Sequence, residues 1–162
     1  MTPAARVQTA IELLDQIAGA ARGKSAPADR ILAEWFRANR FAGSNARRAL
    51  RELVYSAIRA CGPVPESGRA AMLRLVANDA ALASLFDGSQ YGPAPIEGGE
   101  PVAKAGIAPK WLADRLKASD IAGEEAGALL GRAPLDLRVN ALKADRRTLE
   151  LPFWEQTVMM PP

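Results

Sequence analysis

The chain has 162 residues, 49% of them hydrophobic and only 6% aromatic, with no histidine and one cysteine. This composition favours packed helices over sheets, excludes an intrachain disulfide and argues against a zinc site. The net charge of +3 is weak support for nucleic acid unless the basic residues share a face. The pattern of the N-terminal residues is not that of a secretory signal, and no apolar run approaches membrane-spanning length. We therefore expect a mainly α, cytoplasmic protein with no membrane and no metal partner.

Two helices are predicted before residue 40. Apolar residues recur at helical spacing from Val7 to Ile17, and Gly19 together with residues 22–25 ends this first helix. Pro27 suits the first turn of a second helix. That helix carries Trp35 and Phe36.

Two further helices are predicted up to residue 86. Ser44 follows Gly43 and is placed to cap a third helix that runs to about Ala60, and the Gly-Pro-rich residues 62–65 stop it. A fourth helix is predicted after this stop. It carries Leu73, Val76, Ala77 and Ala80 on one side, with Leu85 and Phe86 near its end.

The second half of the chain changes character twice. Residues 87–109 are rich in glycine and proline and are interpreted as a flexible linker. Pro109 then opens a short helix with Trp111, and Asp120 is placed to cap another helix. Residues 135–141 alternate apolar and polar side chains, which predicts a strand with one buried face.

The third helix carries the strongest candidate binding surface. At about 100° per residue, its apolar residues fall in one arc and four arginines fall in the opposite arc. Such a face suits RNA phosphates, and Arg37 and Arg40 on the preceding segment extend it. The alternative is a solvated face whose arginines pair with Glu52 or nearby acids. The four arginines are Arg47, Arg48, Arg51 and Arg59.

Other candidate residues favour structural roles. Cys61 has no histidine partner and is interpreted as a packed thiol rather than a nucleophile. Trp35, Phe36 and Trp111 lie at apolar helix positions, where core packing is favoured over base stacking. The chain has no nucleotide-binding glycine motif and no marked pair of acids, so we expect no catalytic residue in it.

Residues 135–143, LDLRVNALK, resemble the "LRVNxLK" segment that opens the methyltransferase region of the RsmB/Sun (Fmu) family of RNA cytosine-5 methyltransferases. Residues 109–112 resemble the family's "P-x-W-L" helix start, and 125–130 its next helix. Residues 29–35 and 47–55 resemble its NusB-like N-terminal domain. The resemblance covers roughly residues 5–150. The tail 151–162, which contains Pro152 and ends in Pro-Pro, departs from the family pattern.

The resemblance implies a NusB-like helical RNA-binding domain over residues 1–132, followed over 133–162 by the first β-strand of a truncated α/β module. It implies the RNA-binding part of a rRNA (cytosine-5) methyltransferase, with rRNA as partner and Arg138, Asn140 and Lys143 as further RNA contacts. S-adenosylmethionine is expected for the full-length family member, whereas no cofactor is expected in this chain. The alternative is a NusB-like protein-binding module in transcription antitermination.

Overall fold

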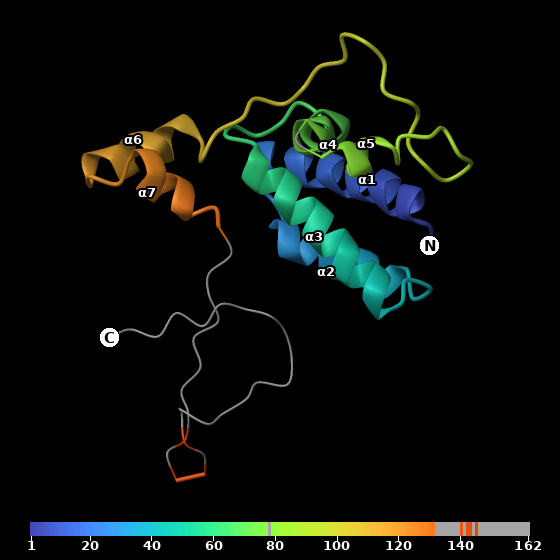
Figure 1. The fold of residues 1–162 in the computed structure, drawn as a ribbon, viewed down its shortest axis with the longest axis horizontal. Coiled ribbons are helices and arrows are strands. Elements are labelled where there is room, and N and C mark those ends of the chain that lie inside the picture. The colour runs from blue at the N-terminus through green and yellow to red at the C-terminus, as the bar shows by residue number, and fades with distance from the viewer. Residues whose placement is uncertain (78, 132–139, 141, 144, 146–162) are drawn as a thin grey trace. The chain divides into compact units, whose positions relative to one another are not determined.

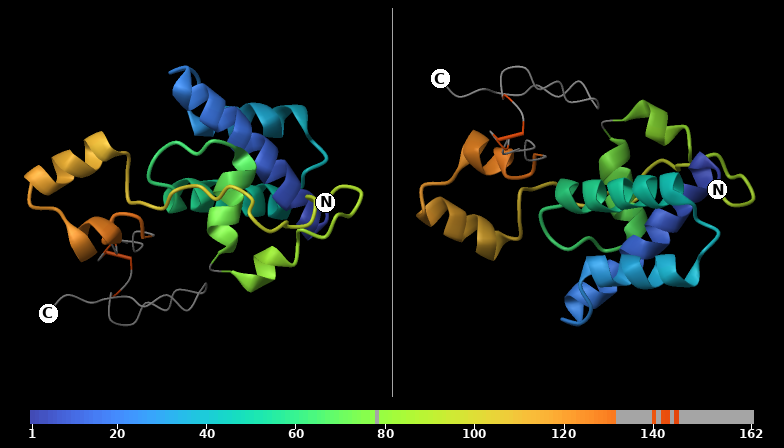
Figure 2. Two further views of the ribbon diagram at one scale, coloured as in Figure 1. Left: turned by 90° about the horizontal axis from the view of Figure 1, so that it is seen from above. Right: turned by 90° about the horizontal axis from the view of Figure 1, so that it is seen from below.

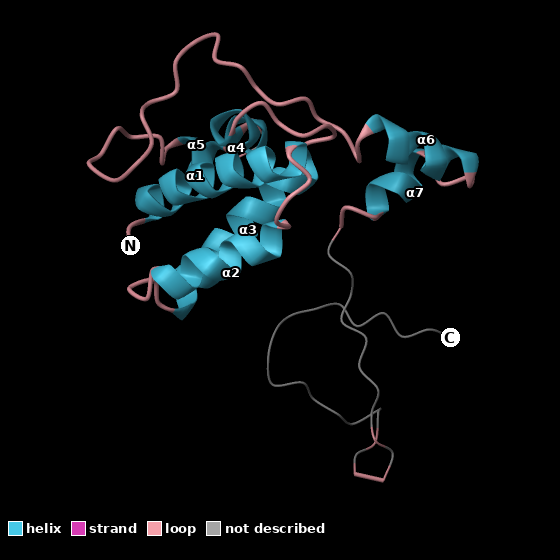
Figure 3. Ribbon diagram, turned by 180° about the vertical axis from the view of Figure 1, so that it is seen from behind, coloured by secondary structure: helices cyan, strands magenta, loops and turns pink. Residues whose placement is uncertain are grey.

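The computed structural model describes residues 1–77, 79–131, 140, 142–143 and 145. The described residues are mainly helical, as expected, and Figure 3 shows helices and loops among them. The chain divides into two units, residues 1–130 and 131–162. The helices of the described residues are α1 Pro3–Arg22, α2 Ala28–Ala38, α3 Ser44–Ala60, α4 Gly68–Val76, α5 Ala80–Ala83, α6 Lys110–Ala118 and α7 Gly123–Ala128 (Figure 1).

Helix α1 is the central element of the bundle. It packs against α2, α3 and α4, and Figure 2 shows it crossing α3. Thr2 caps its N-terminus by accepting a hydrogen bond from the amide of Ala5 at 3.2 Å. Its apolar face is almost fully buried, which explains why the predicted periodicity from Val7 to Ile17 was clear. The buried apolar residues of α1 are Ala4, Val7, Ala10, Ile11, Leu13, Leu14 and Ala18.

Helix α4 crosses α1 in direct backbone contact at Gly68. A Cβ at this position would lie 2.0 Å from the carbonyl oxygen of Ile11, so only glycine fits without a shift of the backbone. The Gly68 amide donates to Oδ1 of Asp15 at 2.7 Å, and the Ala70 amide donates to Oγ of Ser67 at 3.0 Å. These two side chains cap α4 and fix where it crosses α1.

The second helix begins one residue later than predicted, and the third begins one residue earlier. Pro27 is the N-cap of α2 rather than part of its first turn, and Gly43 is the N-cap of α3. Ser44 is the first helical residue and makes no capping hydrogen bond through its side chain, so the prediction that it caps the helix was wrong. The predicted end of the third helix at Ala60 is confirmed.

The predicted fourth helix is two helices. Helix α4 ends at Val76, and Asp79 begins α5 by accepting a hydrogen bond from the Leu82 amide at 2.9 Å. An aspartate that caps a new helix competes with continuation of the previous one. The buried face also differs from the prediction, because Ala77 and Ala80 are exposed. Leu73 is buried as predicted, and it is joined in the core by Ala70, Ala71 and Met72.

The Gly/Pro-rich segment 87–109 is tied to α4 by Arg69. The Arg69 guanidinium binds both carboxylate oxygens of Glu100, at 2.5 and 2.8 Å, and donates to the carbonyls of Ala94 and Pro95. It also stacks over the Phe86 ring, 5.2 Å from the centroid. Further along, the Ala103 amide donates to the Ala70 carbonyl at 3.0 Å. These contacts attach the segment to α4, which corrects its interpretation as a flexible linker.

Past the segment 87–109, the structure corrects two predictions. Trp111 on α6 is 64% exposed, so it is not a core residue. Asp120 does not cap α7, whose N-cap is Ala122. The strand predicted over residues 135–141 lies outside the described residues except for Asn140, which accepts a backbone hydrogen bond from Lys143 at 2.9 Å.

Candidate nucleic-acid interface

Three aromatic rings form the corner between α2 and α3. Phe36, near the end of α2, is only 4% exposed. Trp35 meets the Phe36 ring edge-on with 5.5 Å between centroids, and it meets Phe41 in the same manner at 6.2 Å. Phe41 lies in the turn between the helices and is 71% exposed. The core position predicted for Phe36 is confirmed, and Trp35 packs against the core.

Two arginines of α3 lie over the Phe36 ring. The guanidinium carbon of Arg51 is 5.1 Å from the ring centroid, and that of Arg47 is 5.7 Å away. Arg47 also donates to the carbonyl of Ala42 at 2.7 Å and to that of Phe36 at 3.4 Å. It therefore joins the end of α2 to the start of α3, which is a structural role that its place in the arginine arc did not indicate.

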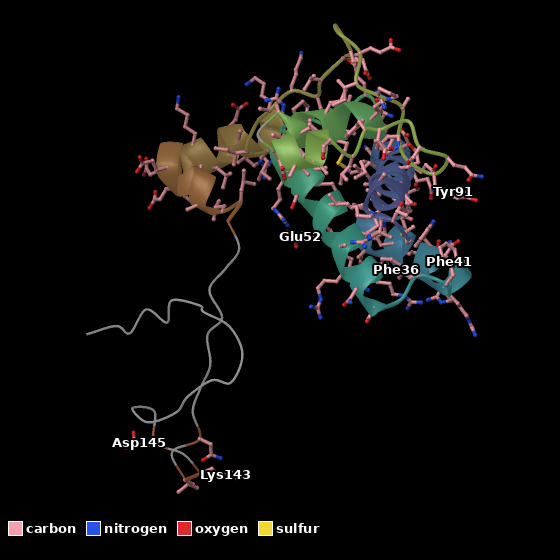
Figure 4. The ribbon with its side chains drawn as sticks, turned by 45° about the vertical axis from the view of Figure 1, so that its right-hand side comes forward. Phe36, Phe41, Glu52, Tyr91, Lys143 and Asp145 are labelled. Atoms are coloured by element: carbon pink, nitrogen blue, oxygen red, sulfur yellow. The ribbon has the colours of Figure 1, made fainter. Side chains whose placement is uncertain are left out.

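Around this corner the sequence from residue 37 to residue 51 contains five arginines and no acidic residue. We call these five residues the arginine cluster. None of them forms an ion pair in the part of the chain that the structure describes. Four of the five are exposed, and nitrogen-tipped side chains project around Phe36 and Phe41 in Figure 4. The arginine cluster comprises Arg37, Arg40, Arg47, Arg48 and Arg51.

The two acids nearest the arginine cluster in the sequence are already paired with other cations. Glu34 binds Arg30 one helical turn away, at 2.9 Å. Glu52 binds Arg59 at 3.5 Å, and the Arg59 guanidinium also donates to Ser56 at 3.0 Å. Arg59 thus follows the alternative interpretation of the basic face, with its charge partly neutralised by Glu52. Arg48 and Arg51 do not pair in this way.

The remaining predicted RNA contacts belong to the second unit. Arg138 lies outside the described residues. Asn140 accepts a hydrogen bond from the amide of Leu142 through its side-chain Oδ1, at 3.0 Å, and Lys143 is exposed. Their proposed contact with RNA stays a prediction.

Cys61 is the C-cap of α3, directly after its last residue Ala60, and is 7% exposed. Burial raises the pKa of its thiol, and the positive charge of Arg74 opposes this only in part. A raised pKa reduces the fraction of thiolate, the reactive form. Cys61 also pairs its backbone with Ala105 in an isolated antiparallel bridge. These features agree with a packed thiol.

A cleft of about 1120 Å³ runs along the exposed side of α1. Phe41 lines it, so the cleft adjoins the arginine cluster. Tyr91, 67% exposed, lines it from the segment 87–109, and both aromatic side chains point to the same side of the bundle in Figure 4. Polar groups lie between them, including Gln8 and Glu12, which hydrogen-bond to each other at 2.9 Å.

Two features of this surface were missed from the sequence. Phe41 was not singled out, although an aromatic residue directly after Arg40 in a turn is a recognisable signal. The acid-free run 37–51 was also available, because counting acids along the chain reveals it without a structure. By contrast, the cleft depends on contacts between α1 and the segment 87–109, which no local pattern shows.

No protein-family model matches the chain, and the searches of curated proteins and of solved structures returned no significant match. The described residues contain no group of three or more histidine, cysteine or acidic side chains arranged to hold a metal ion. Among the same residues, no helix combines the length and the apolar character needed to span a membrane.

Proposed function

We propose that this protein binds RNA through the arginine cluster at the corner of α2 and α3. The observation that supports the proposal is that five arginines gather there without a carboxylate partner in the described chain. A surface arginine paired with an acid has little charge to offer, whereas an unpaired guanidinium can bind a phosphate through two parallel hydrogen bonds. Stacking on Phe36 holds Arg47 and Arg51 in place without consuming their charge.

In its fuller form, the proposal makes this chain the RNA-binding N-terminal part of a rRNA (cytosine-5) methyltransferase that uses S-adenosylmethionine. That part rests on the resemblance of residues 135–143 and 109–112 to the RsmB/Sun family. In this family a separate Rossmann-like domain binds the cofactor and carries the catalytic cysteines. Cys61 is buried at the end of a helix of the bundle. It therefore does not correspond to a catalytic cysteine of the family.

The cleft along α1 favours a second candidate function, a NusB-like module that binds a protein. Tyr91 and Phe41 are the large exposed aromatic residues of the cleft, and aromatic residues are enriched in protein interfaces. This candidate predicts a stable protein partner and RNA affinity that does not depend on the arginine cluster. A pull-down with the wild-type chain and with an arginine-cluster variant separates the two functions.

A filter-binding titration against structured rRNA fragments at low salt tests the RNA proposal. We expect Arg48→Gln and Arg37→Gln each to weaken binding by about fivefold, because each removes one phosphate contact. Both side chains are exposed and make no hydrogen bond in the described structure, so the fold should be unaffected.

The matched control is Arg30→Gln, which removes the same charge from α2. Because Arg30 is already paired with Glu34, we expect the affinity to stay within about twofold of wild type. If Arg30→Gln and Arg48→Gln lose equal affinity for RNA, binding depends only on the net charge of the protein. That result, or no binding at low salt, would contradict the proposal.

A further inference from the structure

We propose that Phe41 stacks on an unpaired base, so that the RNA bound by the arginine cluster is single-stranded where it passes the turn between α2 and α3. This inference rests on the proposed RNA-binding function and specifies its substrate class. Phe41 is 71% exposed, and its only ring contact in the described structure is with Trp35, which is partly buried against the core. Most of the Phe41 ring is therefore open to a ligand.

The Phe41 ring is held in place rather than free. Its edge-on contact with Trp35, which in turn meets Phe36 edge-on, fixes the ring at the end of a row of three aromatics. A fixed aromatic ring loses less conformational entropy on binding than a mobile one. Base stacking on such a ring is independent of sequence, because every base has a π face.

Charge divides the surface around Phe41 into two sides. Arg40 precedes it in the chain and the rest of the cluster lies on α2 and α3, which suits the phosphate backbone. The cleft that Phe41 lines contains Gln8 and Glu12, where a carboxylate repels phosphate but accepts hydrogen bonds from base amino groups. We therefore place the backbone on the arginine side and the unpaired base at the mouth of the cleft.

A double helix cannot use this arrangement. Its bases are stacked on one another, and the deep, narrow major groove of RNA keeps side chains from their edges. A surface that works by charge alone would favour the duplex, because its phosphates are denser. A preference for single strands therefore distinguishes stacking by Phe41 from simple electrostatic binding.

The test is fluorescence anisotropy with a labelled 12-nucleotide RNA of mixed sequence, as a single strand and as a duplex with its complement. We expect the single strand to bind about tenfold more tightly than the duplex. Phe41→Ala and Phe41→Leu should weaken single-strand binding by about fivefold to tenfold, and Phe41→Trp should retain it. Duplex binding should not change with any of the three.

Trp111→Ala is the control, because Trp111 is an exposed aromatic residue, at 64%, that lies on α6 and does not line the cleft. We expect the affinity of this variant for RNA to stay within about twofold of wild type. Equal binding of the two RNA forms, or a loss of affinity in Phe41→Ala no larger than in Trp111→Ala, would overturn the stacking role. If Arg48→Gln still weakens binding in that case, RNA binding by the arginine cluster stands without base stacking by Phe41. If neither RNA form binds, both the RNA-binding function and the stacking role are rejected.

Discussion

At Gly68, a missing side chain sets the distance between two helices. The carbonyl of Ile11 would lie 2.0 Å from a Cβ there, and the backbone amide of Asp15 would lie 2.8 Å from it. Both atoms belong to the backbone of α1, so neither can move aside without moving the helix. Gly19, on the exposed side of α1, has no atom within 4 Å of its ideal Cβ position.

We therefore expect opposite effects from the same substitution at these two glycines. Gly68→Ala should lower the free energy of unfolding by about 3 kcal/mol, because α4 must move off α1. Gly19→Ala should raise it by about 0.5 to 1 kcal/mol, since alanine is the better helix former. Chemical denaturation followed by circular dichroism measures both. A Gly68→Ala variant as stable as wild type would show that the helices do not cross here in solution.

The arginine face shows how far a helical wheel can predict the role of a residue. The wheel correctly placed Leu50, Val54 and Ala57 in the core. It treated Arg47 and Arg48 as equivalent, yet only Arg47 donates to backbone carbonyls of the preceding turn. That difference depends on where residues 36–42 lie in space, which the spacing within one helix does not contain.

At the scale of elements, helix positions were predictable and the segment 87–109 was not. Apolar periodicity predicted α1, α2 and α3 to within a few residues, because each buries a regular face. Glycine and proline indicated that 87–109 is irregular, which is correct. The glycine and proline content did not show that the segment is attached to α4. Its main partner Arg69 lies 31 residues before Glu100 in the chain, and no periodic pattern links such distant residues.

The ion pair between Arg69 and Glu100 makes the attachment of this segment sensitive to pH. Hydrogen bonding to Arg69 is the main cause that lowers the pKa of Glu100 from 4.5 to about 2. Because the folded-state pKa lies below the unfolded one, the ionised pair stabilises the attached segment fully above about pH 4.5. This contribution is lost as the pH falls through about 2.

We expect Glu100→Gln to increase amide hydrogen exchange at Ala103, whose amide donates to Ala70, relative to wild type at pH 7. The difference should shrink as the pH approaches 2, where the wild-type carboxylate also becomes protonated. Glu34→Gln, which removes an exposed ion pair from α2, should leave Ala103 unchanged. Equal protection of wild type and Glu100→Gln at pH 7 would mean that the ion pair does not hold the segment.

At the scale of the whole molecule, basic charge is concentrated locally rather than globally. The net charge is only +3, yet residues 37–51 alone carry five positive charges and no negative one. The net charge of the chain is therefore weak support for RNA binding, and the local concentration of arginines is the stronger support. The methyltransferase assignment belongs to this scale too and stays a proposal, since the predicted strand over residues 135–141 lies outside the described residues except for Asn140.

The salt dependence of RNA binding tests the central claim most directly. Each phosphate neutralised on a single strand contributes about −0.7 to the slope of log K against log salt. If all five arginines of the cluster contact phosphates, the wild-type slope should be about −3.5. Arg48→Gln should reduce its magnitude by about 0.7, and Arg30→Gln should leave it unchanged. A slope near zero, or one that Arg48→Gln does not alter, would contradict RNA binding by the arginine cluster.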